Sequence, residues 1–209
     1  MSSFPRSPRL CKGALGIIDE PGASPKFIYF QYNLDSIKRT LSPKFGKTKE
    51  GNSEPFRLEG APSESMDISI ELDATDYLEY PDQNPVAVGL GINPQLAALE
   101  TMIYPKSTQI IANAALAAMG TKEIIPPLGP LVLFVFGATK VLPVKITKFM
   151  TTEEAYDTNL NPIRAKVDLT LEVLTYEDLQ QSQMAYSLYH ANHIFKEILA
   201  QLAPAKGEN

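Results

Sequence analysis

Two histidines near the end of the chain have a spacing that could support chemistry. His190 and His193 stand three residues apart, which would place both imidazoles on one face of a helix, where they could share a metal ion. The surrounding residues lack the His-Glu-x-x-His pattern of zinc hydrolases. We therefore expect these histidines to be surface or helix-packing residues, and we expect no bound metal.

The other reactive side chains do not form a recognisable catalytic set. Cys11, the single cysteine, could act as a nucleophile, but a lone thiol is more often a packing residue. Glu153, Glu154 and Asp157 could attract a cation, yet the alternating ligands and the glycine of a calcium loop are missing, so we expect solvated charges. The chain also lacks P-loop, Gly-x-Gly-x-x-Gly, Gly-x-Ser-x-Gly and Cys-x-x-Cys motifs. We expect a protein without enzymatic activity or a cofactor.

Asp67, Glu71 and Asp73 could be paired catalytic carboxylates, but their spacing has a structural explanation. They alternate with an apolar series, which predicts a β-strand with one buried and one exposed face. The apolar series consists of Met66, Ile68, Ile70 and Leu72. We expect the three carboxylates and Ser69 to lie on the exposed polar face.

The longest alternating run in the chain spans residues 163–173. Its polar parity contains Arg164, Lys166, Asp168, Thr170 and Glu172. Its apolar parity contains Ile163, Ala165, Val167, Leu169, Leu171 and Val173. Residues 141–149 alternate more weakly, and Asn159, Asn161 and Pro162 supply turn residues, so a β-hairpin with a long loop is predicted. A two-stranded ribbon of that length is marginal alone, so its apolar face needs a cover.

Composition limits the class of protein. A chain of 209 residues with 44% hydrophobic side chains can form one substantial domain, and a net charge of -5 argues against nucleic acid as the main partner. The most apolar stretches, 110–119 and 131–136, are far shorter than the roughly 20 residues of a membrane-spanning helix. The first residues do not resemble a secretory signal, so we expect synthesis in the cytoplasm.

Further elements complete a β-rich α+β prediction. Short strands are expected at 10–18, 26–32 and 131–136, and residues 36–60 form a long polar loop that could include an extended segment. One helix is expected from Asn93, as N-cap, to Tyr104, and another at 184–202. Residues 106–127 fit either a short helix or an ordered loop.

If the strands at 65–74 and 163–173 share a sheet, their polar residues form one wet face and could pair across strands. The helix from Pro94 to Tyr104 is the expected cover of the dry face. Such a small sheet keeps two open edges, which tend to recruit partners, and self-association into a closed ring would remove them.

Three segments resemble a known family. The segments FIYFQYNLDSIKR, GPLVLFVFG and FMTTEEAYDTNLNPIRAKVDLTLEV occur in this order, and together they resemble the tube-type N-terminal domain of contractile injection system proteins, relatives of phage tail tube and baseplate hub proteins. The resemblance covers roughly residues 10–178. Leu34 stands where the family usually has proline, and Asn161 where it commonly has glycine.

The resemblance implies a β-barrel or split barrel with one outer helix, six copies of which join their sheets around a channel. The residues implied to face the lumen are Asp67, Glu71, Asp73, Arg164, Lys166, Asp168 and Glu172. The residues implied to form the barrel core are Ile68, Ile70, Leu72, Leu133, Val135, Val167, Leu169 and Leu171.

The implied function is that of a baseplate tube initiator or adaptor between the spike hub and the inner tube. Its partners would be sister copies, inner tube, hub and baseplate proteins, within a phage tail-like particle assembled in the cytoplasm. The expected organisation is an arm at 1–9, the tube-like domain at 10–178 and a helical extension at 179–209, in which no LysM module fits. Alternatives are a repeating tube subunit, a monomeric ligand-binding β-barrel and, on the histidine pair alone, an enzyme.

Overall fold

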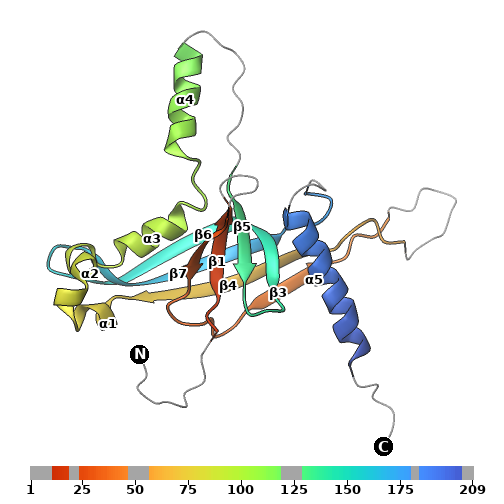
Figure 1. Ribbon diagram of the computed structural model, residues 1–209, viewed down its shortest axis with the longest axis horizontal. Helices are drawn as coiled ribbons and strands as arrows, with labels where there is room; N and C mark the ends of the chain where they lie inside the picture. Colours follow the sequence, from red (N-terminus) through yellow and green to blue (C-terminus); the bar gives the residue numbers. More distant parts are fainter. Residues whose placement is uncertain (1–10, 19–23, 47–56, 119–128, 180–183, 204–209) are drawn as a thin grey trace, which may run out of the picture.

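Seven strands form one antiparallel sheet in the order β2-β1-β5-β6-β7-β4-β3 (Figure 1). The structure is a computed structural model that describes residues 11–18, 24–46, 57–118, 129–179 and 184–203. The strands are β1 (Ala14–Ile18), β2 (Lys26–Tyr29), β3 (Lys38–Ser42), β4 (Ser63–Asp73), β5 (Leu131–Val135), β6 (Val141–Tyr156) and β7 (Pro162–Val173). The helical elements are α1 (Thr75–Leu78), the 3-10 turn η1 (Pro81–Gln83), α2 (Pro85–Leu90), α3 (Asn93–Glu100), α4 (Ser107–Ala118) and α5 (Met184–Gln201). The expected β-rich α+β class is confirmed.

Strands β4 and β7 lie side by side and follow the predicted alternation. Ile70 is opposite Val167, and Glu71 is opposite Lys166. Along β7 the apolar residues from Ala165 to Val173 are buried, whereas Lys166 is exposed. Because opposite residues of paired strands share a face, the two strands together have one apolar and one polar face.

The hairpin of β6 and β7 is longer than expected. Strand β6 continues to Tyr156 and pairs with β7 almost to its end, so the predicted long loop shrinks to residues 157–161. The Asp157 carboxylate accepts hydrogen bonds from the backbone N–H groups of Asn159 and Asn161, at 2.7 and 2.8 Å. The polar composition of 150–156 indicated a loop, but pairing with the regular strand β7 extends β6 regardless of its weak local pattern.

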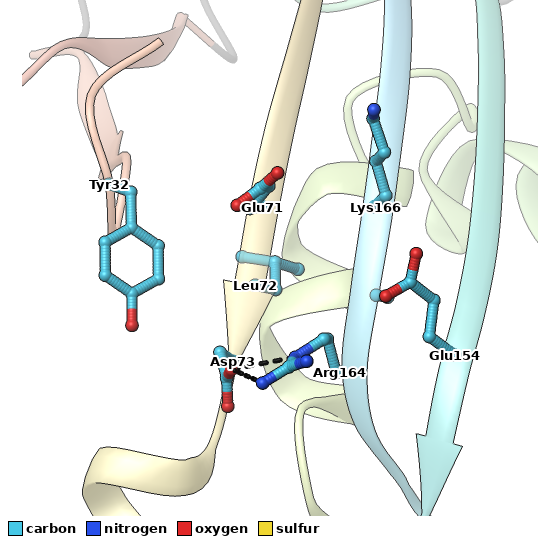
Figure 2. Close-up of a pocket in the computed structure, with 8 residues that line it drawn as sticks. Tyr32, Glu71, Leu72, Asp73, Glu154, Arg164 and Lys166 are labelled. Atoms are coloured by element: carbon cyan, nitrogen blue, oxygen red, sulfur yellow. Dashed lines mark hydrogen bonds and ion pairs between the residues drawn. The ribbon is translucent and has the colours of Figure 1, made fainter. Parts of the chain in front are cut away.

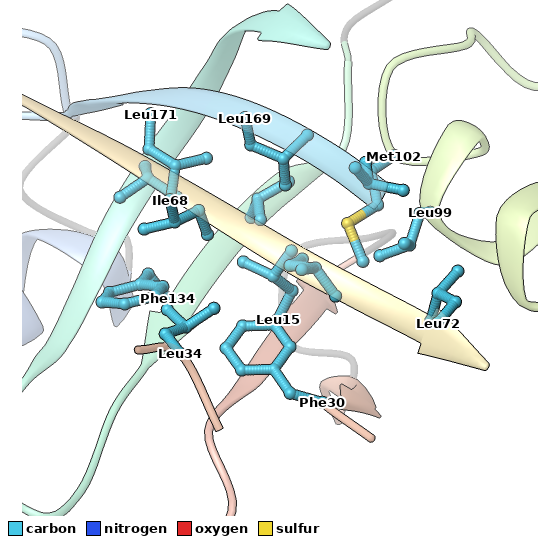
Figure 3. Packing of buried hydrophobic residues seen from close by; sticks show 14 of the residues in the cluster. Leu15, Phe30, Leu34, Ile68, Leu72, Leu99, Met102, Phe134, Leu169 and Leu171 are labelled. Carbon is cyan, nitrogen blue, oxygen red and sulfur yellow. The ribbon is translucent and has the colours of Figure 1, made fainter. Parts of the chain in front are cut away.

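The apolar core lies inside the curled sheet (Figure 3). Its members come from β1, β4, β5, β6, β7, α3 and the segment after β2. The side chains that Figure 3 labels are Leu15, Phe30, Leu34, Ile68, Leu72, Leu99, Met102, Phe134, Leu169 and Leu171. The helix expected to cover the dry face contributes Leu96, Leu99 and Met102. Strands β1 and β5, residues 30–34 and Tyr189 of α5 also cover this face. A sheet that folds over itself buries its own face without needing a full helical layer.

The prediction that Leu133 and Val135 of β5 belong to the core is wrong, because neither is a member of this cluster. Leu133 is buried and Val135 is half-buried, while Val132 and Phe134 are the cluster members from β5. Alternation along the strand explains the correction, because 132 and 134 share the inward face and 133 and 135 share the opposite one.

A helical segment that the sequence analysis did not predict caps the tip of the hairpin. It consists of α1, η1 and α2 and leads into α3. The backbone N–H of Ile92 donates to the Pro162 carbonyl at 2.9 Å and so joins this segment to the hairpin. The predicted N-cap, Asn93, is wrong, because Ile92 occupies the N-cap position of α3 and no side chain caps the helix. The Asn161 side-chain amide donates to the Gly89 carbonyl at 3.2 Å.

Helix α4 stands away from the sheet in Figure 1, whereas helix α5 packs against it through Tyr189 and Lys196. Helix α4 decides between the alternatives for 107–118 in favour of a helix, and none of its residues is buried. Helix α5 confirms the predicted C-terminal helix and contacts β6. Strand β3 and an isolated bridge between Phe45 and Leu58 lie within the expected loop 36–60. The arm at 1–9 and parts of 36–60, 106–127 and 179–209 fall outside the described residues.

None of the helices in the described segments has the length and apolar character needed to cross a membrane.

Candidate functional site

The polar face of the ribbon formed by β3, β4, β7 and β6 is the candidate functional site. The strand registers bring acidic and basic residues to this face from all four strands. The acidic residues are Asp67, Glu71, Asp73, Glu154, Asp168 and Glu172, and the basic ones are Lys38, Lys145, Lys148, Arg164 and Lys166. The two signs nearly balance, so the face is strongly hydrated without a large net potential.

Cross-strand pairs order this face. Arg164 forms an ion pair with Asp73 at 2.7 Å, and Lys145 pairs with Glu172 at 2.9 Å. The Thr170 hydroxyl donates to the Asp67 carboxylate at 2.9 Å. All seven residues implied to face the lumen lie on this face, as exposed or half-buried side chains.

Asp73 is the best-connected carboxylate of the polar face (Figure 2). Burial by itself would raise the pKa of the Asp73 carboxyl, but hydrogen bonds from the Thr75 side chain and backbone and from Arg164 outweigh burial and lower that pKa. The hydrogen bond to Asp73, together with the attraction between the charges, raises the pKa of the Arg164 guanidinium. Both groups therefore remain charged over the physiological range, which suits a structural ion pair.

A shallow groove of about 300 Å³ lies at the Asp73 end of the face. Tyr32, Glu71, Glu154 and Lys166 are among its lining residues, and Figure 2 shows Tyr32 approaching from the segment after β2. Burial and then the negative charge of Asp76 raise the pKa of the Tyr32 hydroxyl, so it stays a neutral hydrogen-bonding group. The groove is a concavity within the polar face rather than an enclosed cavity.

The two sides of this ribbon are open strand edges. Strand β5 pairs with β6 only through Val141–Val144, so from Lys145 to Tyr156 the outer edge of β6 has no strand partner among the described residues. On the other side of the ribbon, β3 pairs only with β4 in the described part of the chain, and all five of its residues are exposed. Each edge therefore offers backbone N–H and C=O groups to another strand.

The residues considered for metal or nucleophilic chemistry do not converge. The His193 Nε2 lies 3.3 Å from the Glu197 carboxylate, whereas the His190 ring packs against Tyr186 with ring centroids 4.5 Å apart. Cys11 is exposed and remote from both histidines in the sequence. Within the described segments, no group of three or more His, Cys, Asp or Glu side chains is arranged to hold a metal ion.

The predicted acidic cluster is divided between three roles. Asp157 organises the hairpin turn, and hydrogen bonds from the Asn161 side chain and then from its backbone lower the pKa of the Asp157 carboxyl. The Glu153 carboxylate accepts a hydrogen bond from the Tyr156 hydroxyl and thereby raises the pKa of that hydroxyl. Glu154 lines the groove of the polar face.

Two polar contacts that the sequence analysis missed shape the ribbon. The Gln31 side chain bonds both backbone groups of Asp73: its amide donates to the carbonyl at 2.6 Å and its oxygen accepts from the N–H at 3.0 Å. Gln31 thereby ties the segment after β2 to the end of β4. Glu64 lies on the apolar parity of β4, is 6% exposed, and contacts Arg39 and Lys196. The sequence signal for this contact was a carboxylate at a position where the alternation of β4 predicts an apolar residue.

Comparison of the chain with protein-family models found no match, and comparison with curated proteins also found none.

Proposed function

We propose that this protein is a structural ring subunit of a contractile injection system, a phage tail-like particle. The single observation that carries the proposal is the ribbon β3-β4-β7-β6, which combines a polar face, a buried apolar face and an open edge on each side. The three segments that resemble tube-type domains contribute to the same ribbon and its cover, since they include residues of β2, β5, β6 and β7.

Copies joined through these edges would extend the sheet around an axis. The β6 edge of one copy and the β3 and β4 side of the next are different surfaces, so the contact is heterologous, and it closes into a ring when the rotation is a whole fraction of a turn. Closure removes every open edge of the ribbon. The direction of curvature follows from burial, because the apolar face already contacts the core of its own chain.

The polar face would then line a water-filled channel. Its near-equal numbers of acidic and basic side chains avoid a channel with strong repulsion for either sign of charge. The ion pairs across β4, β7 and β6 hold these side chains against the wall rather than across the opening. We therefore assign no catalytic step to the face; its role is mechanical and electrostatic.

Within the particle, we place the ring between the spike hub and the stacked inner tube, as an initiator or adaptor. Helices α4 and α5 support this position, because both add exposed side chains to the surface of the sheet. Such a ring would template polymerisation of the tube and travel with the spike when the sheath contracts. Assembly would take place in the cytoplasm, in a particle that is later released or docked at a membrane.

Negative-stain electron microscopy of the purified protein, alone and together with the proteins encoded by neighbouring genes, tests the proposal. Single rings with an axial channel, or rings at the junction of a spike and a tube, are the expected result. Long tubes of this protein alone would support the repeating-tube alternative. A sharp monomer in both preparations would contradict the ring.

A further inference from the structure

A small apolar groove lies between helix α5 and the sheet. One side is formed by Ile37, which precedes β3, and by the buried Met66 and Leu142. The other side is formed by Phe195 and Leu199 of α5, and we call the space between them the α5 groove. Its volume of about 150 Å³ matches that of a cavity that binds one benzene molecule. The α5 groove therefore has room for one aromatic ring or one large aliphatic side chain.

The α5 groove lies on the face of the ribbon opposite the polar face. Met66 belongs to the apolar parity of β4, and Arg39 of β3 is its cross-strand neighbour. The Asn192 side-chain amide donates to the Thr139 carbonyl at 3.1 Å and ties α5 to the hairpin of β5 and β6. The groove is therefore preformed, so a partner loses little binding energy in ordering it. A partner can reach this face whether or not the ring forms.

Three cations surround the apolar base of the α5 groove. They are Arg39, Lys140 and Lys196. Glu64 accepts hydrogen bonds from Arg39 and Lys196, at 2.9 and 3.2 Å, whereas Lys140 has no carboxylate partner in the described part of the chain. Three positive charges against one negative charge leave two positive charges at the groove, although the whole chain has a net charge of -5.

Glu64 holds two of these cations without using all of their donors. The side chains of Arg39 and Lys196 are 31% and 44% exposed. A guanidinium has five N–H donors and an ammonium has three, and Glu64 accepts from two of the former and one of the latter. The other donors remain available to a second carboxylate. Hydrogen bonds between charged groups are roughly twice as strong as those between neutral ones.

We propose that the α5 groove binds an acidic peptide segment of a partner protein. One aromatic side chain of that segment enters the groove, and its neighbouring carboxylates bind Arg39, Lys140 and Lys196. An aromatic anchor in a pocket is a common centre of a binding hot spot, and opposite charges at the rim select the partner and speed its approach. A phosphate backbone would satisfy the cations but leave the apolar base of the groove uncovered.

The apolar surface continues along α5 past the groove, which favours a peptide over a small aromatic acid. Leu202 follows Phe195 and Leu199 at a spacing that keeps all three on one helical face. Leu202 is 73% exposed, and Figure 1 shows the end of α5 extending beyond the sheet. A single ring with a carboxylate would fill the groove and leave Leu202 in water, whereas a peptide segment can cover both.

Fluorescence anisotropy with the full chain and a short labelled peptide tests the proposal. The probe has one central phenylalanine with two glutamates on each side. We expect saturable binding of this probe, and binding weaker by about tenfold or more when alanine replaces the phenylalanine or lysines replace the glutamates. Added salt should weaken binding of the glutamate probe, because the cations at the rim are partly exposed.

Two neighbouring side chains of α5 provide a matched pair of variants. Leu199 lines the groove and is 47% exposed, whereas Ile198 does not line it and is 48% exposed. Leu199→Asp should weaken binding of the probe by about tenfold or more, and Ile198→Asp should leave it unchanged. Because both positions are half exposed, both variants should keep the circular dichroism spectrum of the parent protein.

A second pair of variants tests the charges. Lys140→Glu reverses a charge at the groove, and Lys148→Glu makes the same change at an exposed position of the polar face. Lys140→Glu should weaken binding of the probe by about fivefold at low salt, and the difference should shrink at high salt. Lys148→Glu should have little effect at either salt concentration.

Other outcomes would overturn the inference in distinct ways. Equal effects within either pair of variants, or no saturable binding of the glutamate probe, would show that the groove does not bind such a segment. Phenylacetate that competes with the probe at equal concentration would assign the groove to a small aromatic acid. Self-association that Leu199→Asp abolishes in sedimentation experiments would assign it to a second copy. None of these results removes the ring, which electron microscopy tests separately.

Discussion

Glu64 of β4 joins three elements of the fold, because its carboxylate contacts both β3 and α5. Its carboxylate accepts from Arg39 of β3, with the Arg39 Nε at 2.9 Å, and from Lys196 of α5 at 3.2 Å. The Glu64 side chain is 7% exposed, whereas those of Arg39 and Lys196 are 31% and 44% exposed. The two cations are therefore partly solvated, and the buried carboxylate is the member that depends on its partners.

Replacing Glu64 with Gln should lower the free energy of unfolding by about 2 kcal/mol, a value below that for fully buried pairs because Arg39 and Lys196 reach solvent. Urea unfolding measures the change. The matched control is Glu172→Gln, whose partner Lys145 is 56% exposed, and it should change stability by less than about 0.5 kcal/mol. Equal effects of the two variants would contradict a special role for Glu64.

Asp73 should make stability depend on acid pH. Its pKa in the folded protein is lowered, because hydrogen bonds from Thr75 and Arg164 outweigh the opposing effect of burial. A carboxyl group with a lowered folded pKa stabilises the fold above its unfolded pKa of about 3.9, and this contribution disappears as the pH falls through the folded value. Asp73→Asn should lower stability at pH 7 and flatten the loss of stability below about pH 4. Unfolding curves between pH 2 and pH 7 measure this; an unchanged acid slope would contradict it.

At the scale of elements, the joint between α2, α3 and the hairpin tip depends on one backbone conformation. Gly91 has φ +58° and lies directly against the Pro162 carbonyl. Its neighbour on α2, Gly89, is helical and has open space where a Cβ would be. Two glycines of one short segment therefore have opposite tolerance for a methyl group.

Gly91→Ala should destabilise the protein by about 2–3 kcal/mol, because left-handed backbone strain adds to the clash with Pro162. Gly89→Ala should instead be neutral or stabilise the protein by about 0.5–1 kcal/mol, because alanine favours the helix and meets no atom. Thermal unfolding of both variants measures the difference. Similar melting temperatures for the two variants would show that α2 does not sit against the hairpin tip as described.

At the scale of the whole molecule, the unequal lengths of neighbouring strands create the open edge of β6. Strand β6 has 16 residues and β5 has 5, so most of β6 lies beyond the reach of its neighbour. The long strands run past the curled part of the sheet in Figure 1. An open edge of this length tends to pair with a strand of another chain, and in the proposed ring it pairs with the neighbouring copy.

Proline substitutions at Thr151 and Thr152 test the edge. Successive N–H groups of a strand point to opposite sides, so one substitution removes an N–H that bonds β7 and the other removes an outward N–H. The variant that loses the N–H bonded to β7 should unfold the hairpin. The variant that loses the outward N–H should keep its circular dichroism spectrum but lose ring assembly. Light scattering and electron microscopy measure assembly. Intact rings from the folded variant would exclude β6 as the joining edge.

Much of the ribbon was predictable from local patterns. The alternation along β4 and β7 assigned Asp67, Glu71, Arg164 and Lys166 to one face, because the side-chain direction in a strand depends only on parity. Helix α5 was predictable for the same kind of reason, a helical period of apolar residues. Seven of the eleven charged residues of the polar face were therefore predicted without knowledge of contacts between distant segments, whereas Lys38, Lys145, Lys148 and Glu154 were placed there only by the strand registers and the groove.

Only the tertiary structure decided how far β6 extends, what covers the dry face, and where the open edges lie. These features depend on pairing between segments far apart in the chain, and no local composition encodes such pairing. Residues 150–156 have the polar sequence of a loop, yet they form a strand because β7 is beside them. Glu64 and Gln31 show the same limit, since their partners Arg39, Lys196 and Asp73 belong to other elements.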